Sequence, residues 1–222
     1  MNETIKDQQH RIGTAVNSSF YALERIAGHA AAYKAEKAKI DGYTDYTEAA
    51  RQSMTDRAAA TYGNAVAPEI VKLTEQAGII RDALAVMEST LDTGAELQNA
   101  LNVAKLGKAL PSAVRFNLFE QFRGQPQQIA VLSAAFEAVD IDPSPYMVPI
   151  SFTADQIGKE LDSAIDAVSA AKAGETFQAW QLSRNLEKMG DRVGADTPRR
   201  ASELDGLSGG LDEAIRWAVL GE

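Results

Sequence analysis

Hydrophobic residues return every three or four positions through the first 40 residues of the chain. Residues at such spacings share one face of an α-helix. The pattern predicts one helix over residues 4–39, roughly 50 Å long at 1.5 Å per residue, and Asp41-Gly42 supplies the glycine that commonly ends a helix. The positions are Ile12, Val16, Ser19, Leu23, Ile26, Ala30 and Tyr33.

A second apolar stripe follows the same heptad spacing without interruption. Its strict alternation of three and four residues is typical of helices that pack in left-handed pairs. A second helix, capped by Thr44 or Thr47, is expected before this stripe. Gly63 and Pro68 predict a break or kink between that helix and the stripe, because proline lacks the N–H that a helix interior uses. The stripe consists of Ile70, Leu73, Ala77, Ile80, Leu84, Met87 and Leu91.

Prolines punctuate the middle of the chain between residues 110 and 149. Pro111-Ser112 and Gln125-Pro126 are each expected to begin a short helix, since proline is tolerated in a first turn. Segment 146–152 is expected to be extended, because a residue before proline avoids the α region. It is the one candidate strand in the sequence, and Pro149 restricts it to an edge.

These patterns predict an all-α fold. We expect a multi-helix bundle with long, coiled-coil-like N-terminal helices and a smaller C-terminal half of short helices punctuated by proline. Residues 1–107 would form the long-helix region and residues 108–222 the short-helix region, as separate domains or as one continuous domain. The period is the same for two antiparallel helices of one chain and for a coiled coil between chains, so both arrangements stay open.

Charge and composition exclude several function classes. The net charge is −9, and no basic run is longer than Arg199-Arg200, so direct binding to nucleic acid is not expected. The chain has no cysteine, which excludes disulfides and thiolate metal sites. The first residues are polar and no stretch of 18 apolar residues occurs, so we expect neither a signal peptide nor a membrane span, and a cytoplasmic location.

Candidate chemistry is sparse. His10 and His29 lie about 28 Å apart on one helix and cannot share a metal ion there. Gly206-Leu207-Ser208-Gly209-Gly210 has the G-x-S-x-G form of a nucleophile elbow, but no strand precedes it and no histidine follows it. We therefore expect no catalytic residue, no metal site, no cofactor and no enzymatic activity.

Large side chains on the helices are candidates for packing or for an interface. Trp180 and Trp217 suit an interface or a core. Five tyrosines crowd the N-terminal helices, where amphipathic rings suit a contact surface or a half-buried seam; they are Tyr21, Tyr33, Tyr43, Tyr46 and Tyr62. The full set of candidates is Ile12, Val16, Leu23, Ile26, Tyr33, Ile70, Leu73, Ile80, Leu84, Met87, Leu91, Trp180 and Trp217.

Acidic, cysteine-free, alanine-rich helices without a site motif resemble those of the helical virion-assembly proteins of tailed phages, such as scaffolding, connector and minor capsid components. The resemblance implies a non-enzymatic structural protein that forms a homo-oligomer or a larger assembly, in the cytoplasm or in a virion. The alternative is a monomeric adaptor or inhibitor that binds a protein target by helix-in-groove contact.

Overall fold

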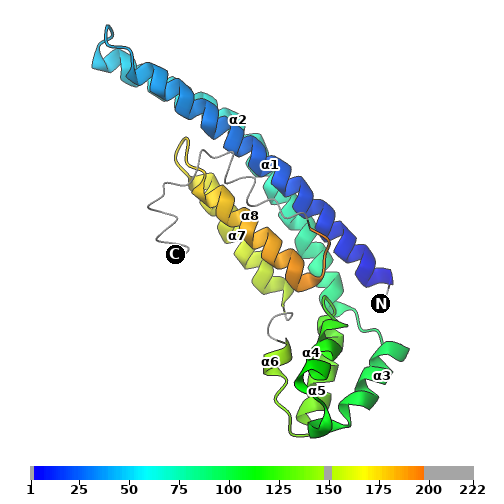
Figure 1. The fold of residues 1–222 in the computed structure, drawn as a ribbon. Coiled ribbons are helices and arrows are strands. Elements are labelled where there is room, and N and C mark those ends of the chain that lie inside the picture. The colour runs from blue at the N-terminus through cyan, green and yellow to red at the C-terminus, as the bar shows by residue number, and fades with distance from the viewer. Residues whose placement is uncertain (1–2, 148–151, 198–222) are drawn as a thin grey trace. The chain divides into compact units, whose positions relative to one another are not determined.

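The fold is known from a computed structural model, which describes residues 3–147 and 152–197. Every regular element in these ranges is helical, so the all-α prediction is confirmed. Two long helices come first, α1 (Glu3–Asp41) and α2 (Glu48–Ser89), and they pack together within one chain (Figure 1). Two antiparallel helices of one chain therefore account for the heptad stripes.

Helix α2 corrects one expectation. It continues through Gly63 and Pro68, so the break that the sequence offered there, as one of two outcomes beside a kink, is wrong. Proline removes one hydrogen bond from a helix interior, but Pro68 itself is exposed and its neighbours Val66 and Leu73 are buried. Apolar packing on both sides of the proline holds the helix together, because burial of an amphipathic face contributes more to helix stability than local propensity does.

Helices α1, α2, α7 (Ala154–Ala170) and α8 (Phe177–Val193) each contribute residues to two compact units. The first unit consists of the described residues within 3–16, 78–159 and 188–197. The second unit consists of the described residues within 17–77 and 160–187. This division is interleaved along the chain.

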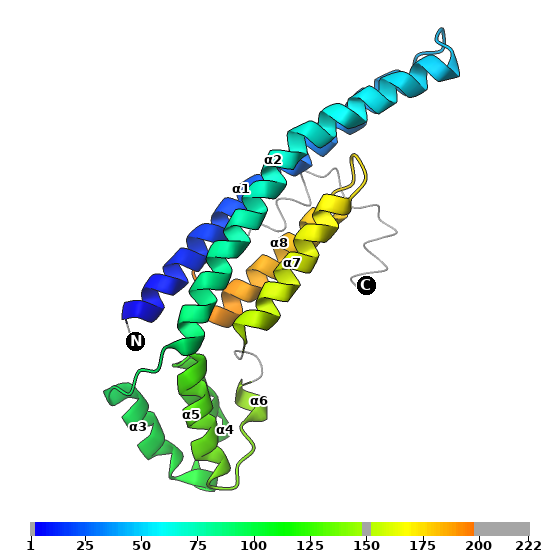
Figure 2. The same cartoon turned by 180° about the vertical axis from the view of Figure 1, so that it is seen from behind.

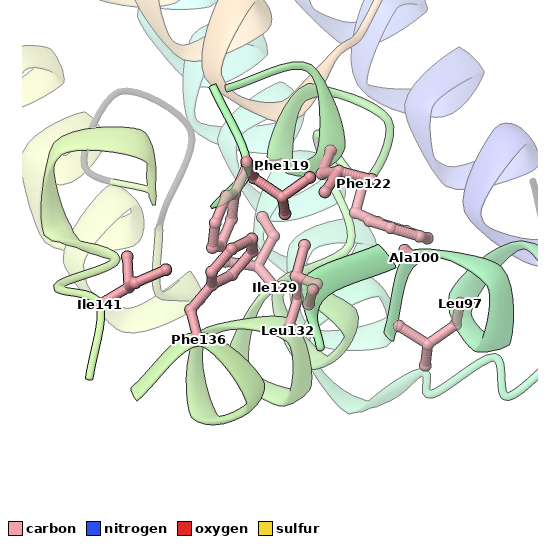
Figure 3. Packing of buried hydrophobic residues seen from close by; sticks show 11 residues of the cluster. Leu97, Ala100, Phe119, Phe122, Ile129, Leu132, Phe136 and Ile141 are labelled. Atoms are coloured by element: carbon pink, nitrogen blue, oxygen red, sulfur yellow. The ribbon is translucent and has the colours of Figure 1, made fainter. Parts of the chain in front are cut away.

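Short helices follow α2 and precede α7 in the sequence of the first unit, as the prolines and glycines indicated. They are α3 (Ala95–Ala104), the 3-10 turn η1 (Gly107–Ala109), α4 (Ser112–Glu120), α5 (Pro126–Glu137) and α6 (Ser144–Met147). Their buried side chains form one cluster in which the rings of Phe119 and Phe136 lie 5.5 Å apart (Figure 3). Leu132 and Ile129 fill the space beside these rings.

The candidate strand at residues 146–152 is wrong where the structure describes it. Tyr146 and Met147 belong to the helical turn α6, and residues 148–151 lie outside the described part. The side chain of Asp142 accepts a hydrogen bond from the N–H of Ser144 over 2.9 Å. Capping of this kind satisfies a first-turn donor and favours a helix over an extended segment.

The second unit contains most of the α1–α2 pair together with parts of α7 and α8, which run alongside it in both views (Figure 2). Phe20, Leu23 and Ile26 are fully or almost fully buried here. Gly174, in the turn between α7 and α8, has φ of +87° and lies against Tyr33 and Lys34, so a side chain at this position would be strained and crowded.

Candidate interaction site

An open groove of about 800 Å³ lies in the second unit, between the end of α1 and the start of α2. We call it the tyrosine groove, because four of its lining residues are tyrosines. Along α1 its lining residues follow helical spacing, as do those of α2, so one face of each helix forms the walls. The lining residues are His29, Ala32, Tyr33, Glu36, Ile40, Tyr43, Tyr46, Met54, Arg57, Ala58, Thr61, Tyr62 and Ala65.

The four tyrosines form two pairs, one at each end of the groove. The ring centroids of Tyr33 and Tyr62 lie 5.8 Å apart, and those of Tyr43 and Tyr46 lie 5.5 Å apart. Tyr33 and Tyr62 are half-buried, whereas Tyr43 and Tyr46 are 41% and 50% exposed. Three alanines, Ala32, Ala58 and Ala65, also line the walls.

The inner end of the groove is drier than its outer end. The pKa of Tyr62 is raised, first because burial disfavours the phenolate and also because Glu175 carries a negative charge nearby; a hydrogen bond with the backbone of Gly174 opposes the shift. Tyr62 therefore stays a neutral phenol near neutral pH. A neutral ring with one polar atom suits contact with an apolar partner that also offers a hydrogen-bonding group.

One acidic and one basic side chain line the walls. Glu36 forms an ion pair with Lys39 over 3.2 Å on the surface of α1. Arg57 makes no ion pair with any residue in the described part of the chain, so its guanidinium is available to a partner's carboxylate. Arginine binds carboxylates through two parallel hydrogen bonds, which gives such contacts direction as well as strength.

Nothing in the groove forms a recognisable reaction centre. His29 lines it, but no group of three or more His, Cys, Asp or Glu side chains that could hold a metal ion occurs among the described residues. His10 lies in the first unit, and the G-x-S-x-G segment at 206–210 lies outside the described residues. The chemistry that the groove offers is therefore non-covalent binding of an apolar surface by aromatic rings.

Most residues that the sequence marked for packing lie in the interior. Ile70, Tyr33 and Trp180 are half-buried, and Trp180 lies 6.0 Å from Phe177 and 5.6 Å from the Arg184 guanidinium. Trp217 lies outside the described residues. The residues that are at most 2% exposed are Ile12, Val16, Leu23, Ile26, Leu73, Ile80, Leu84 and Met87.

Leu91 does not continue the packed stripe. Helix α2 ends at Ser89, and the side chain of Leu91 is 47% exposed. The hydroxyl of Thr90 accordingly turns back to the carbonyl of Val86 over 2.7 Å instead of continuing the helix. The apolar spacing extended the stripe one step too far, because periodicity alone does not mark where a helix ends.

Of the candidates for packing or interface, only Tyr33 lies in the groove. Four of the five tyrosines that crowd the N-terminal part of the chain, Tyr33, Tyr43, Tyr46 and Tyr62, line the groove, and Tyr21 does not. Sequence reasoning missed Ile40, Met54 and Arg57. For Ile40 the available signal was its position four residues after Glu36 and seven after Tyr33, on the same face of α1.

A smaller pocket of about 150 Å³ lies in the first unit, beside the start of α3. Asp92, Glu96 and Gln125 are among its lining residues. Gln125 is almost fully buried, and its Nε2 has no hydrogen-bond partner. A space of this size holds a few water molecules at about 30 Å³ each, and water commonly satisfies buried amides of this kind.

No family model, no curated protein and no solved structure matches the chain. None of the helices in the described ranges combines the length and the apolar character that crossing a bilayer requires.

Proposed function

We propose that this chain is a structural protein without enzymatic activity, and that copies of it associate by placing helical surfaces in each other's tyrosine grooves. The observation that carries the proposal is the groove itself, in which four tyrosines line an open space of about 800 Å³ between two long helices. Tyrosine is enriched at protein interfaces because its ring contributes a large apolar area and its hydroxyl can still form a hydrogen bond.

The dimensions of the groove also favour a helix as the bound element. Along α1 its lining residues extend from His29 to Ile40, which is about 17 Å at helical rise. This length accommodates about three turns of a partner helix, whose apolar face would contact the rings. An assembly role of this kind is what the resemblance to phage virion-assembly proteins implies.

The alternative function uses the same groove for a different protein. A monomeric adaptor would bind an amphipathic helix of its target by contacts with the tyrosines and with Arg57. The two functions differ in the mass of the purified chain, since only the first requires copies to associate.

Light scattering after gel filtration, over a range of protein concentrations, tests the proposal. The native chain is expected to exceed the monomer mass of 23.8 kDa as concentration rises. A Tyr43→Lys, Tyr46→Lys double variant is expected to stay a monomer, because two charges would enter the interface. Tyr21→Lys is the matched control, since Tyr21 on α1 is 47% exposed but does not line the groove.

Two outcomes would contradict the assembly function. A native chain that stays at the monomer mass at every concentration would leave only the adaptor alternative. A double variant that associates as strongly as the native chain would show that some other surface carries the assembly.

A further inference from the structure

The tyrosine groove begins where the α7–α8 pair ends. The turn between α7 and α8 contacts the α1–α2 pair at Tyr33 and Tyr62, through Gly174. Beyond that turn the α1–α2 pair continues, as both views show (Figures 1 and 2), with Tyr43 and Tyr46 exposed. Within the second unit, the described residues thus leave this face without the third helical layer that covers the rest of the pair.

A segment of this chain has the pattern of such a layer. Residues 211–220 lie outside the described residues, between Gly209-Gly210 and Gly221. Leu211, Ile215 and Ala218 recur at steps of four and three, and the pattern predicts an amphipathic helix of ten residues. Its length would be about 15 Å, which fits within the wall that His29 to Ile40 form along α1.

The two surfaces can form a complementary charge contact at Arg57, although Glu36 also lines the groove and the segment contains Arg216. Asp212 and Glu213 follow Leu211 directly and carry two negative charges at the start of the predicted helix. The groove offers Arg57, which has no ion pair among the described residues, and the adjacent surface of α1 carries Lys34 and Lys37. Carboxylate–guanidinium contact at the edge of an apolar groove fixes the orientation of a bound helix.

The connecting residues are long enough. Thr197, the last described residue, lies beside Gly190 of α8. From Gly190 back to Phe177, where α8 begins, the helix measures about 20 Å. Residues 198–210 span up to about 45 Å when extended, so the connection leaves ample slack for the segment to double back along α8.

We infer that residues 211–220 bind as a helix in the tyrosine groove of their own chain. A regulatory consequence follows, and only this consequence rests on the proposed function. The bound segment would compete with the partner helix for the groove and so restrain assembly. Release of the segment would then expose the groove when assembly is required.

Trp217 makes the inference testable in the full chain. The chain has two tryptophans, so Trp180→Phe leaves Trp217 as the single tryptophan emitter. We expect Trp217 emission to be blue-shifted from that of the urea-unfolded chain, with severalfold weaker acrylamide quenching. Adding Arg57→Glu and Tyr46→Glu should move both values toward those of the unfolded chain, because both changes repel Asp212 and Glu213, and adding Tyr21→Glu instead should not. The difference spectrum between the native chain and Trp217→Phe gives the same emission with Trp180 intact.

Three results would overturn the inference. Trp217 emission that already matches the unfolded chain would show that the segment is not docked. Emission that the groove substitutions leave unchanged would place the segment elsewhere. Emission that shifts on dilution would show binding between copies instead of within one chain.

The fluorescence experiment needs no partner, so it tests docking of the segment whether or not the chain assembles. A Leu211→Asp, Ile215→Asp variant connects the two proposals. If both are correct, it associates at a lower concentration than the native chain in the light-scattering experiment. If the chain never associates but Trp217 is protected, the inference holds and the assembly function fails.

Discussion

Gln9 and Val193 are joined by a hydrogen bond although 184 positions separate them in the sequence. Nε2 of Gln9, near the start of α1, donates to the carbonyl oxygen of Val193, the last residue of α8, over 2.9 Å. The last carbonyls of a helix have no partner within that helix. A buried side chain from the other end of the chain therefore supplies one of the bonds that α8 cannot make for itself.

Replacing Gln9 by Met should destabilise the fold while preserving the volume of the side chain. The carbonyl of Val193 would lose its donor, and an unpaired buried carbonyl costs about 1–3 kcal/mol. Denaturant unfolding measures the loss in the free energy of unfolding. Thr14→Ala, at an exposed position of the same helix, is the control and should change the free energy little. Equal effects of the two substitutions would contradict the role of the bond.

Two glycines of α1 should respond to alanine in opposite directions. A Cβ at Gly13 would lie 2.5 Å from the carbonyl oxygen of Asp196, whereas a Cβ at Gly28 would meet nothing within 4 Å. Gly28→Ala is expected to raise the free energy of unfolding by about 0.5–1 kcal/mol, because alanine loses less backbone entropy in a helix. Gly13→Ala should lower the free energy. Thermal melts of both variants test this, and a Gly13→Ala protein as stable as Gly28→Ala would disprove the close approach.

Glu69 should make the stability of the fold depend on pH. Burial alone would raise the pKa of its carboxyl group, but hydrogen bonds and charges from Arg25 and Lys72 outweigh burial and lower the pKa below its ordinary value of 4.5. Since the folded-state pKa is depressed, the stabilisation is complete above the unfolded-state value and is lost as pH falls through the folded-state value. The Arg25 Nε–Glu69 Oε2 distance is 2.7 Å, and the Lys72 Nζ–Glu69 Oε1 distance is 3.0 Å.

Glu69→Gln should therefore flatten the acid limb of the stability curve. At neutral pH it is expected to lose about 1 kcal/mol, since both cations are about half exposed and water screens them. The variant and the native chain should converge as pH falls through the folded-state pKa of Glu69, which lies below 4.5. Urea unfolding at a series of pH values measures the difference. Glu75→Gln, an exposed carboxylate on the same helix, is the control; if it removes as much pH dependence, Glu69 has no special role.

Much of the fold could be read from the sequence because local signals and packing agree. Pro111 and Pro126 stand at the start of α4 and α5, and Gly42 follows the end of α1, where their backbone preferences place them. The apolar stripes gave the faces that α1 and α2 bury. The break expected at Pro68 and the place of Leu91 in the packed stripe were wrong, because both depend on tertiary contacts and helix ends, which a local pattern does not contain.

The tyrosine groove could be predicted only as a concentration of tyrosines. The groove lies where the α1–α2 pair continues beyond the end of the α7–α8 pair. The α7–α8 pair ends at the turn that contains Gly174, which is more than a hundred residues away from Tyr62 in the sequence. The same face of α1 is covered before that turn and open after it. Residues such as Met54 and Arg57 therefore look no different in sequence from those of an ordinary packed seam.

Pro68→Ala should stabilise the protein, because α2 is continuous and the substitution returns an N–H to its interior. In the native helix the carbonyl of Asn64 lacks the donor that residue 68 would normally provide. We expect a gain of about 1–3 kcal/mol in the free energy of unfolding. Ala67→Pro is the reciprocal variant and should lose a comparable amount. A Pro68→Ala protein that is less stable than the native chain would show that the packing of α2 depends on the proline.

Aspartate at two positions of the second stripe distinguishes the packed part of α2 from its continuation. Leu84 is fully buried and Leu91 is 47% exposed, although the sequence placed both in one stripe. Leu84→Asp puts an unpaired charge into the interior, which costs several kcal/mol, a large share of the roughly 5–15 kcal/mol that stabilises a typical domain. We expect loss of the cooperative unfolding transition, measured by circular dichroism during thermal melting. Leu91→Asp should melt within a few degrees of the native chain, and a Leu84→Asp protein that did the same would mean that this face of α2 is not packed.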